Sequence, residues 1–197
     1  MNETIFRVLA VLIPVTAMSI SGYYRRRADR EGGGRVPTSQ ESRPIFFALR
    51  IGGLLLWLSP ILYAINPDLL AWSRLGLPEW TRWLGLVLAL ACIPGIFSLF
   101  RHIGTGITPT VTTRREHHLV TTGPYRWIRH PLYTVATTFF LGLALMIDSW
   151  LTGALALGAI LLLARRTDSE EQNLIAKFGD EYRTYMSRTG RFLPKVF

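Results

Sequence analysis

Five apolar stretches, separated by polar connections, dominate the hydropathy pattern of the chain. They cover Ile5–Tyr24, Ile45–Ile65, Trp80–Phe100, Leu132–Ile147 and Trp150–Ala164. A helix needs about 20 residues to cross a bilayer, and the first three stretches have that length. The last two are shorter and are separated only by Asp148 and Ser149, which indicates a tight helical hairpin. The pattern therefore predicts an all-α, polytopic membrane protein with five transmembrane helices.

The polar region after the fifth stretch has a helical pattern of its own. An amphipathic helix is predicted from Ala164 to Lys177, with acidic residues near its start, where the helix dipole favours anions. Gly179 suits the left-handed conformation that ends many helices, so we expect the helix to stop there. A second short helix is predicted over Glu181–Arg188. Within the hairpin, Gly142, Gly153 and Gly158 are expected to let its two helices pack closely.

Composition supports a membrane protein and excludes several other classes. Hydrophobic residues make up 49% of the 197 residues and charged residues only 18%, which excludes a chain that is disordered throughout. Cys92 is the only cysteine, so neither a disulfide scaffold nor a cysteine-based zinc site is possible. The net charge of +9 fits loops that face anionic lipid better than it fits nucleic-acid binding, and no nucleic-acid partner is expected.

The positive charge is concentrated in alternate connections. Residues 25–43, residues 101–130 and the tail after Ala164 hold 18 of the 22 Lys and Arg. With five crossings all three segments face the same side, and the positive-inside rule makes that side cytoplasmic. We therefore expect an integral membrane protein with its N-terminus outside and its C-terminus inside.

The connection from Arg101 to Pro131 carries unusual chemistry for a loop. Gly123-Pro124 marks a turn, and Pro131 stands where a helix can start. His130 and Tyr133 would then lie at the mouth of that helix, at the membrane surface. Free N–H groups and a partial positive charge make such a mouth suitable for the carboxylate of a small ligand.

A second candidate group lies on the tail. Arg166 and Glu170 are four residues apart, hence on one helix face, and on spacing alone an ordinary surface ion pair is the favoured interpretation. The histidines at 117, 118 and 130 match no standard metal-ligand spacing, so no metal is expected.

The order of these motifs resembles that of isoprenylcysteine carboxyl methyltransferases. The resemblance rests on HHLVTTGPY at 117–125, RHPLY at 129–133, FGDEY at 178–182 and GRFLP at 190–194. It covers about residues 100–197, whereas residues 1–100 match only in general hydropathy. The family consists of integral-membrane enzymes that use S-adenosylmethionine, and the wider group contains phospholipid N-methyltransferases and sterol-reductase relatives.

The resemblance implies two regions. Residues 1–100 would form three N-terminal transmembrane helices with a basic cytoplasmic loop at 25–44. Residues 101–197 would form the catalytic region, in which the 101–131 loop and the C-terminal helices make a cytoplasmic cap over the cofactor.

It also implies specific roles. The expected S-adenosylmethionine site consists of His117, His118, Leu119, Val120, Tyr125, His130, Pro131, Leu132, Tyr133 and Glu170. The first four would line the adenosine end, the next five the methionine portion, and Glu170 the amino group. Arg166 would be the catalytic residue that faces the methyl acceptor. Thr110 stands where eukaryotic members place a Gln that touches the cofactor.

The residues and the resemblance leave several chemical classes of methyl acceptor open. The resemblance favours the carboxylate of a prenylated cysteine or a similar lipid, which needs an orienting cation such as Arg166 and no base. A phospholipid amine must first lose a proton, and Glu171 or His118 keeps that option open. A reductase that uses NADPH, and a membrane protein without enzymatic activity, are further alternatives.

Overall fold

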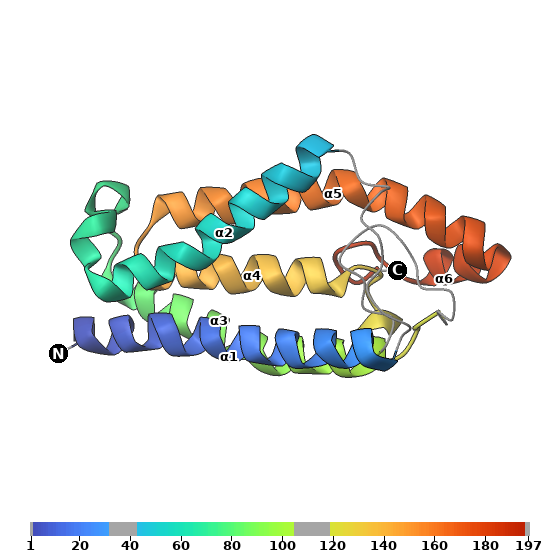
Figure 1. Ribbon diagram of the computed structural model, residues 1–197, viewed down its shortest axis with the longest axis horizontal. Helices are drawn as coiled ribbons and strands as arrows, with labels where there is room; N and C mark the ends of the chain where they lie inside the picture. The colour runs from blue at the N-terminus through green and yellow to red at the C-terminus, as the bar shows by residue number, and fades with distance from the viewer. Residues whose placement is uncertain (1, 32–42, 105–118, 196–197) are drawn as a thin grey trace.

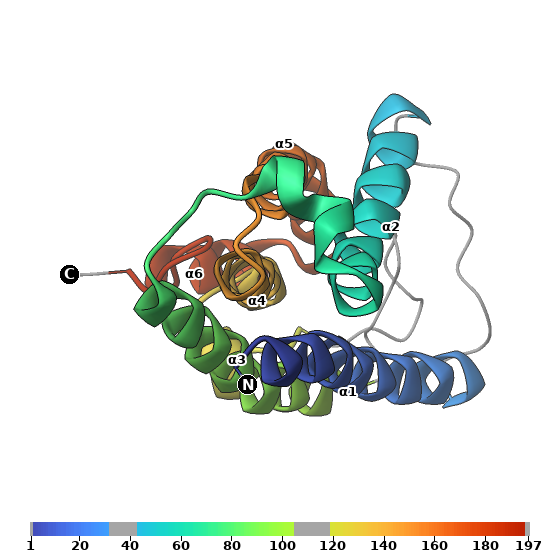
Figure 2. The ribbon, with the colours of Figure 1, turned by 90° about the vertical axis from the view of Figure 1, so that its left-hand side faces the viewer.

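The computed structural model describes residues 2–31, 43–104 and 119–195, which form a bundle of long helices along one axis (Figure 1). The helices are α1 (Asn2–Glu31), α2 (Arg43–Ile65), α3 (Glu79–Ile103), α4 (Pro131–Met146), α5 (Trp150–Phe178) and α6 (Asp180–Arg188), with short 3₁₀ turns η1 (Pro67–Ser73) and η3 (Gly123–Arg126). Seen end-on, α4 lies in the middle, between α5, α2 and α3 (Figure 2). The shortest of the five bundle helices is therefore its centre.

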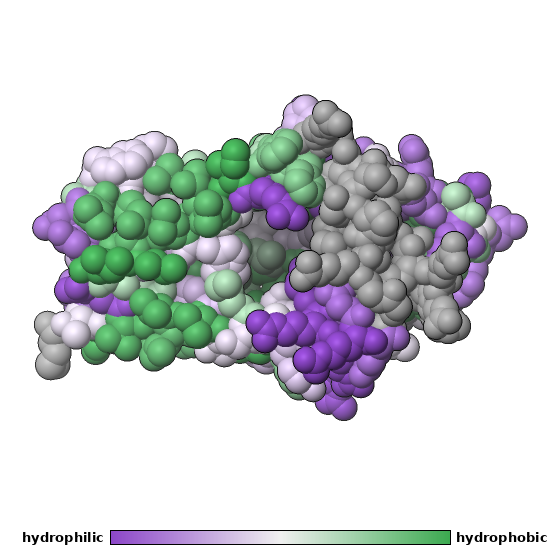
Figure 3. Space-filling model, viewed as in Figure 1, coloured by the Kyte–Doolittle hydropathy of each residue, from purple (hydrophilic) through white to green (hydrophobic). Residues whose placement is uncertain are grey.

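Within the described residues, four helices are long and apolar enough to cross a membrane: α1, α2, α3 and α5. The fourth predicted crossing is the 16-residue α4, which is apolar but shorter. Large apolar side chains such as Leu54, Val87 and Leu161 are exposed along the long helices. Figure 3 shows apolar residues over the left and middle of the bundle, and most of the hydrophilic residues to the right of its centre. This surface suits a lipid environment, so the chain is a polytopic membrane protein of four to five spans.

Two predicted boundaries are wrong. The basic loop expected from residue 25 begins later, because α1 continues through Arg25–Arg27 to Glu31. The fifth apolar stretch and the amphipathic helix expected from Ala164 form one 29-residue helix, α5. It ends where expected, at Gly179, whose φ of +56° a residue with a side chain rarely adopts.

The contact between α3 and α4 depends on two glycines. A Cβ at Gly85 would lie 2.5 Å from the Gly142 carbonyl oxygen, and one at Gly142 would lie 2.9 Å from the Ala89 nitrogen. Gly142 therefore packs on α3, which corrects the prediction that it serves the hairpin. Gly153 does face Ala144 across the hairpin, at 3.7 Å, whereas a Cβ at Gly158 would meet nothing within 4 Å.

At the end of the bundle that holds the N-terminus, Arg82 joins four helices. Its Nη1 donates to Glu3 at 3.0 Å, its Nε donates to the Met146 carbonyl at 3.0 Å, and its Nη2 donates to the Tyr63 hydroxyl. Its guanidinium also lies over the Phe6 ring, 4.1 Å from the centroid. One cation thus ties α1, α2 and the end of α4 to α3.

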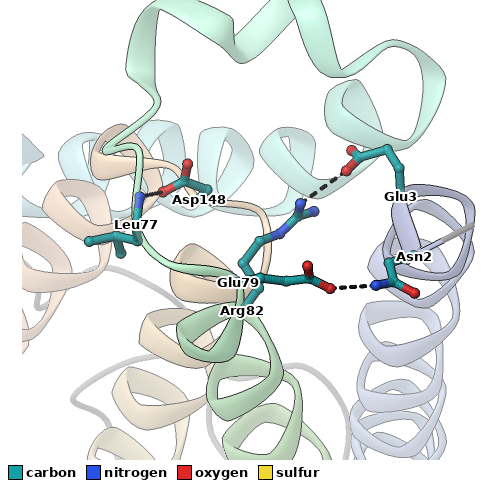
Figure 4. A pocket seen from close by; sticks show the side chains of 6 residues that line it. All are labelled: Asn2, Glu3, Leu77, Glu79, Arg82 and Asp148. Atoms are coloured by element: carbon teal, nitrogen blue, oxygen red, sulfur yellow. Dashed lines mark hydrogen bonds and ion pairs between the residues drawn. The ribbon is translucent and has the colours of Figure 1, made fainter.

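A cavity of about 440 Å³ opens beside Arg82 (Figure 4). It is lined by Asn2, Glu3, Leu77, Glu79, Arg82 and Asp148. The polar groups around it are bonded to one another, since Asn2 donates to Glu79 and Asp148 accepts from the backbone amides of Gly76 and Leu77. These bonds hold the helices together at the end of the bundle that lies away from α6.

Candidate functional site

Three predicted site residues surround the Glu170 carboxylate near the other end of the bundle. The Tyr133 hydroxyl donates to Glu170, with oxygen–oxygen distances of 2.8 and 2.9 Å, and the Arg166 Nε donates to it at 2.8 Å. His130 Nδ1 lies 3.6 Å from the Glu170 Oε2. The start of α4 and the polar part of α5 therefore meet at one carboxylate, whose side chain keeps 14% exposure.

The neighbouring carboxylate, Glu171, points to a different set of partners. It accepts from Arg129 Nε at 2.8 Å and from Arg191 Nη2 at 2.7 Å, and it lies 3.2 Å from His130 Nε2. This hydrogen bonding raises the pKa of the Arg191 guanidinium. Only 4% of the Glu171 side chain is exposed. The imidazole of His130 thus lies between two adjacent carboxylates.

The residues after α6 return to the start of α4. The backbone amides of Arg129 and His130 donate to the carbonyls of Gly190 and Arg191, at 2.9 and 3.0 Å. The Thr134 hydroxyl donates to the Phe192 carbonyl at 2.6 Å. The C-terminal segment is in this way a wall of the same site.

Two tyrosines of α6, Tyr182 and Tyr185, are buried beside this cluster. The Tyr185 hydroxyl donates to the Tyr125 carbonyl at 2.5 Å, and burial raises the pKa of Tyr185 to about 12. Burial also raises the pKa of Tyr182, whose hydroxyl is enclosed and has no hydrogen-bond partner in the described part of the chain. Tyr185 therefore remains a donor over the physiological pH range.

The other residues predicted for the cofactor site, as far as the structure describes them, lie at several places in the fold. Tyr125 is buried in η3, and Pro131 is buried in the first turn of α4, as expected for a helix start. Leu132 packs against the apolar core. Leu119 and Val120 are half-buried. His117, His118 and Thr110 lie outside the described residues.

Sequence reasoning missed the group around Glu171. Arg129 and Arg191 belong to the RHPLY and GRFLP motifs, but the sequence assigns neither of them a site role or a partner. Their partner is 42 and 20 residues away in the chain, so no helical spacing connects them. The signal that was available is the Glu-Glu doublet itself, which places two acids on adjacent sides of one helix. Among the described residues no group of His, Cys, Asp and Glu could hold a metal ion.

Comparison with known families decides the assignment. The profile of the family described as phospholipid methyltransferase matches residues 80–181, just over half of the chain. The chain belongs to this family. The matched part runs from the start of α3 to the start of α6, so it contains both carboxylates and their partners on α4.

The relatives of this phospholipid methyltransferase family member include proteins named as methyltransferases and proteins named for metal resistance. The protein-S-isoprenylcysteine O-methyltransferase of Rattus norvegicus is 30% identical over 130 residues, which are 64% of this chain and 45% of that protein. The nickel-cobalt-cadmium resistance protein NccN of Alcaligenes xylosoxydans xylosoxydans is 33% identical over 86 residues, which are 44% of this chain and 40% of that protein. The chain thus spans less than half the length of either relative.

A solved structure shares the fold. It is the structure of the eukaryotic intramembrane Ras methyltransferase ICMT, isoprenylcysteine carboxyl methyltransferase. It superposes with a TM-score of 0.55 at 22% identity, over 80% of this chain and 55% of that chain. At this identity the likeness shows a common helical architecture, which agrees with the polytopic fold described above.

Proposed function

We propose that this protein transfers a methyl group from S-adenosylmethionine to an acceptor embedded in the membrane. The observation that carries the proposal is the arrangement of His130, Tyr133 and Arg166 around the Glu170 carboxylate. Family membership adds the reaction class, because the phospholipid methyltransferase profile covers all four residues.

The chemistry of these groups fits the cofactor. A partly exposed carboxylate such as Glu170 suits the ammonium of the methionine portion, and the N-terminus of α4 suits its carboxylate. Tyr133 and His130 would hold Glu170 in one orientation. When bound, S-adenosylmethionine supplies an electrophilic methyl group on a positively charged sulfur. The protein then contributes mainly by positioning the two reactants in line.

For the acceptor we propose the carboxylate of a prenylated cysteine or of a similar lipid. Transfer forms an oxygen–methyl bond as the sulfur–methyl bond breaks, and the positive charge of the sulfur and the negative charge of the carboxylate disappear together. Arg166 binds Glu170 and keeps 12% of its side chain exposed, and a guanidinium is suited to orient a carboxylate. The naming of the rat relative supports this class.

A second candidate is a phospholipid amine, which the description of the matched family favours. This reaction needs a base to remove a proton from the ammonium before attack. Glu170 is the more accessible of the two carboxylates, with 14% of its side chain exposed against 4% for Glu171. In this candidate Glu170 would have to serve the acceptor as well as the cofactor.

The experiment that separates these candidates uses the purified protein with host lipids and cofactor labelled in the methyl group. A methyl ester releases methanol in base, whereas a methylated amine is stable. Calorimetry with S-adenosylhomocysteine and with NADPH, each alone, tests the cofactor. Binding of NADPH without binding of S-adenosylhomocysteine would reject the methyltransferase proposal in favour of a reductase.

Two substitutions test the residue roles. Glu170→Ala is expected to weaken S-adenosylhomocysteine binding about tenfold or more, since a charged hydrogen-bond partner is worth about 1.5–3 kcal/mol. Arg166→Ala is expected to lower turnover more than it lowers cofactor affinity. Equal losses of cofactor affinity in both variants would contradict this division of roles.

We also propose that the cluster lies on the cytoplasmic side, with the N-terminus outside. The support is the positive-inside distribution of Lys and Arg, because the tail after Ala164 and the C-terminal turns of α1 are both basic. The polar cofactor would then reach the site from the cytosol, and the acceptor would reach it from the inner leaflet.

A further inference from the structure

We propose that Glu171 is a positioning residue, which holds the C-terminal segment Thr189–Phe192, here called the docked tail, against the start of α4. Through the docked tail it fixes His130 beside Glu170. The inference deepens the proposed function, on which its cofactor readout rests, by separating the roles of two adjacent carboxylates.

The partners of Glu171 come from two segments that are far apart in the chain. Arg129, just before α4, binds Oε1, and Arg191, in the docked tail, binds Oε2, so the carboxylate bridges the two guanidinium groups. His130 Nε2 lies 3.2 Å from the same Oε1. A buried carboxylate shared in this way couples the positions of its donors, because removing it takes the same buried acceptor away from all of them.

Arg129 strengthens the coupling from its own side. Its Nη1 donates to the carbonyl of Met186 at 3.2 Å and to that of Thr189, so the guanidinium caps the end of α6 while it binds Glu171. A cation that joins a carboxylate on α5 to carbonyls at the end of α6 sets where the docked tail begins.

The backbone of the docked tail is itself shaped for close approach. Gly190 donates to the Trp127 carbonyl at 3.1 Å, and residues 128 and 190 pair as in a parallel sheet. A Cβ at Gly190 would lie 1.8 Å from the Leu193 carbonyl oxygen, so the turn that follows requires a residue without a side chain. The Phe192 ring centre then lies 6.1 Å from that of His130. The tail therefore reaches the imidazole directly.

The same contacts argue against a chemical role for Glu171. Both of its oxygens already accept hydrogen bonds from guanidinium groups, and almost none of its surface is exposed. Glu170 has the same charge but more open surface. Of the two acids, Glu170 is the one that a ligand can reach, and Glu171 acts through His130 and the docked tail.

The first experiment measures hydrogen exchange of the amides in peptides covering 127–130 and 189–193, on the full protein in detergent. Glu171→Gln is expected to speed exchange in both peptides about tenfold or more, because the pairing that protects them loses its ionic anchor. Asp168→Asn is the matched control. It removes the other, exposed partner of Arg191, and is expected to leave exchange unchanged.

The second experiment measures S-adenosylhomocysteine affinity by calorimetry in Glu171→Gln, Arg191→Met and the double variant. Each single change is expected to weaken binding about tenfold, and the double variant is expected to be no weaker than the worse single one, since both break one coupled unit. Arg191→Lys keeps the charge and is expected to retain most of the affinity. Arg191 is 37% exposed, so its variants test the inference even where Glu171→Gln does not fold.

Two results would overturn the inference. One is a loss of S-adenosylhomocysteine affinity in Glu171→Gln while hydrogen exchange in the docked tail and the affinity of Arg191→Met are both unchanged. That result would mean that Glu171 touches the cofactor itself. The other is a released tail with unchanged affinity. If the unaltered protein does not bind S-adenosylhomocysteine, the proposed function fails, while the exchange measurement still decides whether Glu171 holds the tail.

Discussion

At the scale of single residues, two tyrosines on α6 differ in what happens to the hydroxyl. Tyr185 donates to the Tyr125 carbonyl, whereas the hydroxyl of Tyr182 is buried with no partner in the described ranges. A buried polar group without a hydrogen bond costs about 1–3 kcal/mol, while a satisfied one adds about 1 kcal/mol of stability. The two rings are neighbours, with centroids 5.8 Å apart, so a Phe substitution at each position compares the two hydroxyls in similar surroundings.

Removing each hydroxyl should therefore have opposite effects. Tyr182→Phe is expected to leave the free energy of unfolding unchanged or to raise it by up to about 1 kcal/mol. Tyr185→Phe is expected to lower it by about 1–2 kcal/mol, because the Tyr125 carbonyl loses its donor. Thermal unfolding of both variants in the same detergent measures the difference, and the reverse order would show that Tyr182 has a partner in the folded protein.

Sequence reasoning reached the residues whose relations are local. Arg166 and Glu170 are one helical turn apart, and the ion pair that this spacing predicts is present. The expectation of an ordinary surface pair is wrong, because the two side chains are only 12% and 14% exposed. Pro131 marks the start of α4, which places His130 and Tyr133 at the helix mouth as predicted. The roles assigned to these residues stay predictions. The Glu-Glu doublet indicates two acids on one helix, but the sequence does not identify the partners of Glu171, because they come together only when the C-terminal segment packs on the start of α4.

At the scale of elements, the hairpin and the stop at Gly179 follow from local signals, namely a polar pair between two apolar runs and a glycine. The continuity of α5 does not, because hydropathy changes sharply at Ala164 although the helix continues. The change in hydropathy reports the surroundings of the helix. Likewise, the helix that Gly142 contacts depends on how α3 and α4 cross, which no periodicity within α4 specifies.

The close contact of α3 and α4 yields a prediction at this scale. Gly85→Ala and Gly142→Ala are each expected to destabilise the protein by about 1–3 kcal/mol, because the added methyl overpacks a backbone contact. Gly158→Ala serves as the control, since its Cβ would meet nothing within 4 Å. The midpoints of thermal unfolding rank the three variants. A Gly158→Ala variant as unstable as the other two would contradict this account of the helix contact.

At the scale of the whole molecule, the distribution of positive charge predicts orientation, and labelling can test it. Cys92 is 7% exposed, so it should contribute little background. Lys195→Cys is expected to react with an impermeant maleimide only in inverted vesicles, and Asp68→Cys only in intact cells. Asp68 is a good probe for the other face because 81% of its side chain is exposed. Reaction of both variants from one side would contradict the predicted topology.

The uninterrupted α5 has a consequence for the position of the protein in the lipid bilayer. At 1.5 Å per residue, its 29 residues span about 44 Å, and Glu170 lies about 30 Å along the axis from Trp150. That distance equals the thickness of a typical hydrocarbon layer, so the length of α5 sets the depth of the Glu170 carboxylate relative to that layer. Reconstitution in lipids with shorter or longer acyl chains is then expected to slow turnover on both sides of an optimum, as the helix tilts to match the layer.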